Sequence, residues 1–264
     1  GGFPFLLAVT SVKEVSVLSG AVLLALITSG LSSFCFGAEP YSSKPVRIIV
    51  CFAPGGAADL VARGLSTQLS EQTHKAFVVD NRPGAGGMFG WGLVAKSAPD
   101  GYTMAVADTS FVIMAAVNKS MPYDVIKDFT AISQVIRTAS VLVINPALNA
   151  STLKEFIALA RANPGKFNFG SAGAASHTHL SGERFKLAAK VDLVHVPFKG
   201  SGEVVAAVVS GTVQMTIASQ TAVLSFLKSG KLRALAVTTD GKRSPVMPDV
   251  PSMSEAGISN MAVT

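Results

Sequence analysis

Charged residues are scarce in this chain: Asp, Glu, Lys and Arg make up 14% of its 264 residues, whereas hydrophobic residues make up 49%. This composition excludes an intrinsically disordered protein, because so apolar a chain can bury a substantial core. The 22 basic and 16 acidic residues leave a net charge of +6, but Lys and Arg never form a run. Without a basic stripe or base-stacking motif we expect no nucleic-acid partner, and a diffuse positive field suits small anions.

Cysteine is nearly absent, because the sequence contains only Cys35 and Cys51. If Cys35 is removed with an N-terminal leader, no disulfide can form within the chain. Cys51 ends an apolar run and is predicted to be a small residue of the core. Together with His177 or His195 it is also the one thiol–imidazole combination available for nucleophilic catalysis.

Complete cofactor and metal motifs are missing as well. The glycines of 84–90 do not form a dinucleotide fingerprint, because Phe89 occupies the place of the third glycine, and no Gly-Lys pair is followed by Ser or Thr. His177 and His179 have no Cys or acidic residue at ligand spacing except Glu183, which is four residues after His179. We therefore predict no cofactor and no metal site, and we expect His179 and Glu183 to form either a pair on a helix surface or a hydrogen bond in the cleft.

The first 38 residues differ in composition from the rest of the chain. Lys13 precedes an apolar segment over 15–31, and the small residues Gly37 and Ala38 follow it. This order is typical of a secretory signal peptide, with cleavage expected after Ala38 and the protein exported to the periplasm. A transmembrane anchor is the competing interpretation, although the apolar core is short for a span.

After Glu39 the sequence repeats one order of elements: an apolar strand, a turn rich in Gly and Ser, and a helix. This alternation predicts an α/β fold with mostly parallel sheets and flanking helices. The predicted strands cover 46–52, 76–79, 102–107, 141–144, 167–170, 192–196, 213–218 and 232–237. Helical periodicity is clearest over 60–70, 153–162, 180–189 and 204–209. Ser151 or Thr152 is expected to cap the helix that starts at Leu153.

Two apolar segments predict that the chain crosses between two lobes. Residues 140–145 lead out of a first lobe, and 232–239 would lead back. We therefore expect a signal peptide over 1–38, lobe 1 over 39–140, lobe 2 over 141–235, and a return segment over 236–264 that starts the remainder of lobe 1. A cleft between two lobes is a common place for a small ligand.

Four turns carry the candidate binding groups, because each follows a strand and opens a helix. They cover 52–56, 81–87, 170–177 and 198–202. At the carboxyl edge of parallel strands such turns lie together and present backbone N–H groups to a ligand. Two further polar groups, 108–110 and 219–221, follow strands in the same way.

The predicted ligand-binding residues come from these turns and polar groups. They are Phe52, Ala53, Pro54, Gly55, Gly56, Gly84, Ala85, Gly86, Gly87, Asp108, Ser110, Ser171, Ala172, Ser176, His177, Lys199, Gly200, Ser219 and Gln220. Ser171 and Ser176 could instead cap a helix, and Lys199 could be a solvated surface residue. Ser171 lies in Gly-Ser-Ala-Gly, which lacks the spacing of a nucleophile elbow, so no catalytic residue is assigned.

Six segments in chain order carry a family resemblance. They are 45–59, 79–87, 99–103, 170–173 with Ser176 and His179, 196–200 and 248–257. Over its length from Tyr41 the chain resembles the Bug-type extracytoplasmic solute receptors of tripartite tricarboxylate transporters. Cys51 stands where the family usually has Pro, and family members continue for several dozen residues, so we expect the C-terminus to be truncated.

This resemblance implies a periplasmic two-lobed protein of the type II-like binding fold. Such a receptor is expected to be a monomer that closes on a small carboxylate, held partly through water by 52–56 and 84–87, and delivers it to integral-membrane transporter subunits. Two alternatives stay open. One is a Cys-dependent hydrolase or transferase acting on a carboxylate, and the other is a ligand-sensing receptor that partners a sensor protein.

Overall fold

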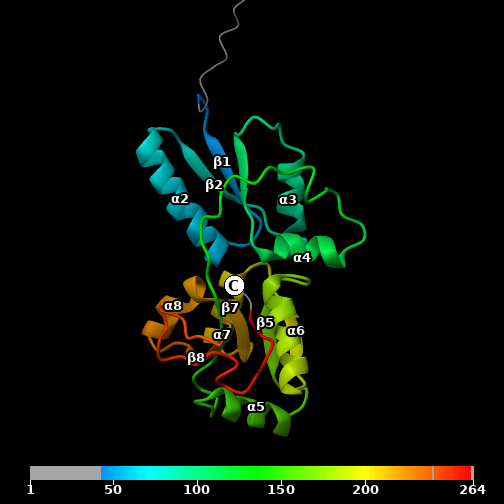
Figure 1. Cartoon of the computed structure of the whole chain (residues 1–264), viewed down its shortest axis with the longest axis vertical. Coiled ribbons are helices and arrows are strands. Elements are labelled where there is room, and N and C mark those ends of the chain that lie inside the picture. Colours follow the sequence, from blue (N-terminus) through cyan, green and yellow to red (C-terminus); the bar gives the residue numbers. More distant parts are fainter. Residues whose placement is uncertain (1–42, 240, 263–264) are drawn as a thin grey trace, which may run out of the picture. The chain divides into compact units, whose positions relative to one another are not determined.

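The computed structural model describes residues 43–239 and 241–262. Lys44–Thr264 form one compact unit. The predicted signal peptide and Cys35 lie outside the described residues. In the described part of the chain, eight strands alternate with helices and form two sheets (Figure 1). The α/β class predicted from the alternation of elements is therefore confirmed.

The first sheet has the strand order β2-β1-β3 and is parallel throughout. Its strands are β1 (Val46–Val50), β2 (Phe77–Asn81) and β3 (Thr103–Val106). Its helical elements are α2 (Ala57–Thr73), the 3-10 turn η1 (Ala85–Gly87), α3 (Met88–Ala95) and α4 (Thr109–Val117).

Strand β1 is buried on both faces of this sheet. Ile48 and Val50 pack against α2, whereas Ile49 and Cys51 pack in a cluster with Trp91 of α3. Successive side chains of a strand point to opposite faces, so both sets must be apolar. This accounts for the uninterrupted apolar run in the sequence.

The second sheet has the strand order β6-β5-β7-β4-β8. Its strands are β4 (Ser140–Ile144), β5 (Asn168–Ser171), β6 (Val194–Pro197), β7 (Met215–Ser219) and β8 (Arg233–Val237). Its helices are α5 (Leu153–Ala162), α6 (His177–Ala189), α7 (Ser201–Val209) and α8 (Gln220–Lys228). Strand β4 runs antiparallel to β7 and β8, whereas β5 is parallel to β6 and β7.

Two apolar layers cover the two faces of the second sheet. Leu142 and Ile144 face a cluster that includes side chains of α5 and α6. Val141 and Val143 face a cluster that includes side chains of α7 and α8. The helices therefore lie on both faces, as the predicted fold class requires.

The described chain passes from the first sheet to the second once, through residues 118–139. At the end of this passage, the backbone N–H of Ser140 donates to Oγ1 of Thr238 at 3.1 Å, and the N–H of Thr238 donates to the carbonyl of Ser140 at 2.8 Å. The two segments predicted to connect the lobes therefore lie hydrogen-bonded side by side.

The segment after β8 differs from our expectation. We predicted that 236–264 returns to the first lobe, but Met253, Ile258 and Met261 pack in the core of the second sheet. Val237 also forms a parallel bridge with Ser252. Burial of these apolar side chains holds the described part of the segment on the second sheet. No helix within 43–239 and 241–262 is long and apolar enough to cross a membrane.

Candidate functional site

Five helix N-termini meet at one cavity between the two sheets. The cavity is partly open to solvent. Residues from the caps or first turns of α2, α4, α6, α7 and α8 contribute to its wall. The lining residues are Phe52, Ala53, Gly56, Ala57, Ala58, Asp59, Asp108, Ser110, Ala172, Ser176, His177, Thr178, Ser201 and Ser219.

The turn between β1 and α2 is fixed by the buried carboxylate of Asp59. This carboxylate accepts hydrogen bonds from the N–H of Gly55 at 3.0 Å, Nε of Arg63 at 2.9 Å and Nδ2 of Asn81 at 3.0 Å. Burial alone would raise the pKa of Asp59, but these hydrogen bonds lower it below its ordinary value. Asp59 is therefore ionised at neutral pH, and its charge is compensated by Arg63.

A chain of hydrogen bonds connects the cavity wall of the first lobe to the start of β4. Asp108 caps α4: one carboxylate oxygen accepts from the N–H of Ser110 at 3.0 Å, and the other is 3.2 Å from its hydroxyl. The N–H of His177, which opens α6 in the second lobe, donates to the Ser110 hydroxyl at 2.9 Å. Nε2 of His177 is 2.9 Å from Oγ of Ser140. His177 thus contacts both lobes.

Desolvation shifts the pKa values of Asp108 and His177 in opposite directions. Asp108 keeps accessible surface where it borders the cavity, but the surrounding protein desolvates its carboxylate and raises its pKa. Desolvation also lowers the pKa of His177. Solvent therefore does little to stabilise the charged forms of these two side chains at the cavity wall.

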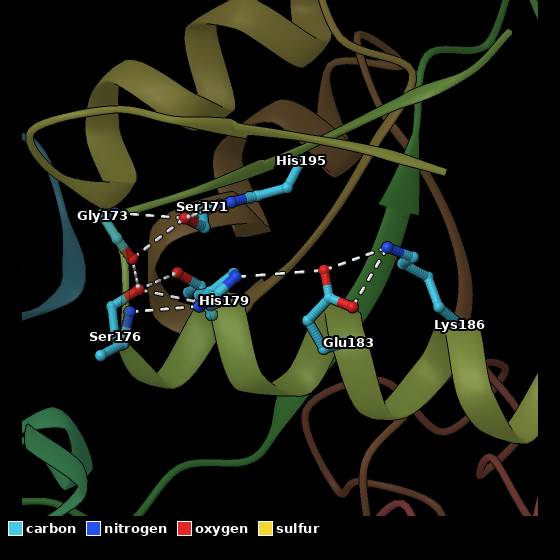
Figure 2. A network of polar contacts seen from close by, with 9 residues as sticks. Ser171, Gly173, Ser176, His179, Glu183, Lys186 and His195 are labelled. Atoms are coloured by element: carbon cyan, nitrogen blue, oxygen red, sulfur yellow. Dashed lines mark hydrogen bonds and ion pairs between the residues drawn. The ribbon is translucent and has the colours of Figure 1, made fainter. Parts of the chain in front are cut away.

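A buried polar network holds the second-lobe turn between β5 and α6 (Figure 2). Oγ of Ser171 is 2.6 Å from Nε2 of His195, and Oγ of Ser176 donates to the carbonyl of Gly173 at 2.6 Å. Ser176 also caps α6 by accepting from the N–H of His179 at 3.3 Å. The sequence left open that Ser171 or Ser176 caps a helix. Ser176 is such a cap, whereas Ser171 hydrogen-bonds to His195.

The two imidazoles of this network stack on each other. The ring centroids of His179 and His195 are 4.0 Å apart, and Figure 2 shows Glu183 between His179 and Lys186. His179 Nε2 is 4.0 Å from Glu183, which forms a 3.1 Å ion pair with Lys186. Desolvation, together with the neighbouring His179, lowers the pKa of His195 to about 4. Both rings therefore pack as neutral groups at neutral pH.

About half of the predicted ligand-binding residues line the cavity. These are Phe52, Ala53, Gly56, Asp108, Ser110, Ala172, Ser176, His177 and Ser219. The wall also contains Ala57, Ala58, Asp59, Thr178 and Ser201, which the sequence interpretation did not assign to the site. Each of these lies at the start or in the first turn of a helix that follows a predicted turn. Ser201 already lies within the predicted turn 198–202, and extending the other turns by one helical turn would have included the remaining four.

The glycine turn of 84–87 does not line the cavity. A Cβ on Gly86 would lie 2.6 Å from the carbonyl oxygen of Ala174, and one on Gly87 would lie 2.6 Å from the ring of Trp91. Both residues also have positive φ angles, of 64° and 101°. Close packing and backbone conformation therefore require glycine here.

The remaining predicted residues have other partners. Lys199 is exposed, and its carbonyl accepts from the N–H of Ala53 at 3.1 Å, so its backbone connects the two lobes. Oε1 of Gln220 accepts from the hydroxyl of Ser244 at 2.9 Å. Gly200 lies so close to Ala53 that a Cβ would be 2.7 Å from its nitrogen. Pro54, Gly55, Gly84, Ala85 and Ser171 also lie outside the set of lining residues.

Cys51 is poorly suited to nucleophilic chemistry. It has no accessible surface, and burial, followed by the charge of Asp108, raises the pKa of its thiol. A protonated, buried thiol is a weak nucleophile. The imidazoles of His177 and His195 hydrogen-bond to Ser140 and Ser171. Within the described ranges, no group of three or more His, Cys, Asp or Glu residues could hold a metal ion.

A two-lobed α/β fold with helix N-termini around an interlobe cavity defines a solute-binding protein of the periplasmic type. The chain belongs to the family described as "Tripartite tricarboxylate transporter family receptor", whose family model matches residues 61–264. The family expected from the sequence segments is thus confirmed.

Individual relatives agree with this assignment. The chain is 38% identical to protein BugT of Bordetella pertussis over 242 residues, which cover 89% of this chain and 74% of BugT. It resembles the structure of R. palustris Rpa4515 with adipate, with a TM-score of 0.81, 32% identity and coverage of 84% and 75%. It also resembles MatC from Rhodopseudomonas palustris with bound malate, with a TM-score of 0.78, 30% identity and coverage of 84% and 76%.

Proposed function

We propose that this protein is a non-catalytic receptor that captures a small carboxylate in the periplasm and delivers it to integral-membrane subunits of a tripartite tricarboxylate-type transporter. The convergence of five helix N-termini on one cavity carries the proposal. Each terminus carries N–H groups that have no partner within its own helix and a partial positive charge, so together the termini can bind a carboxylate. None of the residues that line this cavity in the described chain is Lys or Arg, so backbone donors would do most of the binding.

Several observations support this binding mode. The relatives Rpa4515 and MatC are described with adipate and with malate, both of which are dicarboxylates. Oγ of Ser219, on the cavity wall, is buried and has no hydrogen-bond partner among the described residues. A buried hydroxyl gains stability from a partner, and a ligand carboxylate or an ordered water can supply one.

The organisation proposed for residues 1–235 follows the sequence interpretation. Residues 1–38 form a signal peptide, 39–140 the first lobe and 141–235 the second lobe. Ligand capture would bring these lobes together around the passage at Ser140. The proposed receptor is a monomer, as the family resemblance implies, and residues of one chain line the cavity from both lobes.

Titration calorimetry of the full chain against dicarboxylates, tricarboxylates, aromatic acids and acidic amino acids tests the proposal. Ala58→Asp places a negative charge at the N-terminus of α2, on the cavity wall. We expect it to weaken carboxylate binding by roughly 10- to 100-fold through charge repulsion. Ala58→Asn has the same shape without the charge and should have a much smaller effect. No binding of any carboxylate by the unmodified chain would refute the proposal, and equal effects of the two variants would refute the helix-terminus mechanism.

A further inference from the structure

The cavity contains one acidic side chain whose charge has no cationic partner among its hydrogen bonds. Asp59 is paired with Arg63, but the bonds of Asp108 go to the N–H and hydroxyl of Ser110. Asp108 nevertheless lies on the cavity wall, among the groups that would surround a bound anion. A ligand whose polar groups only accept hydrogen bonds would therefore face another hydrogen-bond acceptor, the carboxylate of Asp108, at this position.

The hydrogen-bond directions around Asp108 determine what it can offer a ligand. Oγ of Ser110 accepts from the N–H of His177 at 2.9 Å, so the hydroxyl proton of Ser110 is free to point at Asp108. Both carboxylate oxygens of Asp108 then act as acceptors, one for the N–H and one for the hydroxyl. A carboxylate has about four acceptor positions, so acceptor capacity remains for a group in the cavity.

We propose, on the basis of the receptor function above, that Asp108 determines specificity by accepting a hydrogen bond from an ammonium or hydroxyl group on the carboxylate ligand. The ligand class is thus an amino- or hydroxy-carboxylate. Its carboxylate binds at the helix N-termini, where Ser219 supplies an unpartnered hydroxyl, and its donor group faces Asp108. The surrounding protein partly desolvates the Asp108 carboxylate, which strengthens this preference, because such a carboxylate gains more from a donor than a fully solvated one does.

Two ligand series with constant carbon chains test this inference by calorimetry of the full chain at neutral pH. The first is succinate, malate and aspartate, and the second is glutarate, 2-hydroxyglutarate and glutamate. Each series changes only the substituent next to one carboxylate, from hydrogen to hydroxyl to ammonium. In at least one series, we expect a substituted ligand to bind roughly tenfold or more tighter than its unsubstituted parent. The preferred substituent distinguishes a hydroxyl from an ammonium ligand.

Asp108→Asn tests the residue itself. Asn caps a helix about as well as Asp, so α4 is expected to remain folded. We expect this variant to bind parent and substituted ligands with similar affinity. Asp124→Asn is the matched control, because Asp124, like Asp108, accepts from the backbone N–H of the residue two positions later, but it lies outside the cavity wall. It should keep the preference of the unmodified chain.

The outcomes separate this inference from the receptor function. Binding without preference in the unmodified chain, or tighter binding of the parents, overturns the role of Asp108 but leaves the receptor intact. A preference that survives in Asp108→Asn also overturns it. If none of the six ligands binds, the inference fails, and the receptor proposal is decided separately by the wider carboxylate screen. Asp108→Asn could unfold at a much lower temperature than the unmodified chain. In that case the order of ligand affinities in the unmodified chain alone supports or overturns the role of Asp108.

Discussion

At the scale of single residues, His195 shows how burial makes a side chain sensitive to pH. Its ring stacks on His179 and contacts Ser171, and Glu183 and Lys186 are the charged groups nearby. The folded protein holds His195 neutral, with a pKa of about 4, whereas the ordinary value is 6.5. The unfolded chain therefore binds a proton between these two pH values when the folded chain does not.

We predict that the free energy of unfolding falls as the pH is lowered from about 6.5 to about 4. His195 should contribute roughly 1–2 kcal/mol to this loss, less than the full pKa difference implies because the ring keeps some solvent contact. Chemical denaturation at a series of pH values measures the effect. His195→Gln should flatten the slope in this window, whereas His74→Asn, at an exposed position, should not. An unchanged slope in His195→Gln would contradict the prediction.

The sequence indicated the turns of the site better than the side chains that face the cavity. Strand-to-turn positions follow from local patterns, so Ala53, Gly56 and His177 could be found. Whether Ser171 points to a ligand or to His195 depends on a partner 24 residues away on β6. Glycines such as Gly86 are equally ambiguous, because close packing and ligand contact both require a small residue.

At the scale of secondary-structure elements, helix α5 illustrates how local signals define boundaries. Its predicted and observed limits agree, because capping residues, amphipathic spacing and a Pro-Gly stop all coincide. Thr152 is the N-cap: its Oγ1 accepts from the N–H of Glu155 at 3.2 Å. The carboxylate of Glu155 in turn accepts from the N–H of Ser151 at 2.7 Å.

We predict that Thr152→Ala lowers the free energy of unfolding by about 1 kcal/mol, because it removes the cap of α5. Ser151→Ala is the matched control, since Ser151 takes part through its backbone N–H and should change stability by no more than a few tenths of a kcal/mol. Thermal or urea denaturation of both variants gives the comparison. A larger loss of unfolding free energy in Ser151→Ala than in Thr152→Ala would contradict the assignment of Thr152 as the N-cap.

Other elements could not be defined from the sequence alone. Helices α3 and α4 are apolar along nearly their whole length, so periodicity cannot distinguish them from buried strands. The antiparallel direction of β4 was also not predictable, because an apolar run carries no information on strand direction. The two-lobed arrangement was easier to predict, since the apolar segments 140–145 and 232–239 and the family resemblance both indicated it.

At the scale of the whole molecule, small residues allow the two lobes to approach closely. The α7 residue Gly202, in the second lobe, lies against Pro54 and Gly55 in the first-lobe turn. A Cβ added to Gly202 would contact the carbonyl oxygen of Pro54 and lie 2.9 Å from the carbonyl carbon of Gly55. These are backbone atoms, which cannot move aside without displacing the turn that borders the cavity.

We predict that Gly202→Ala hinders lobe closure and weakens ligand binding by roughly 10- to 100-fold, because a smaller fraction of the protein can reach the closed arrangement. Gly64→Ala is the matched control: it also adds a methyl group to a helix, but nothing lies within 4 Å of the new Cβ. Both substitutions favour helix formation by roughly 0.5–1 kcal/mol, so a loss of binding in Gly202→Ala alone isolates the interlobe contact. Calorimetry measures affinity, and small-angle X-ray scattering with and without ligand measures the compaction that closure produces. If Gly202→Ala binds and compacts like Gly64→Ala, close approach at this glycine is not required for ligand capture.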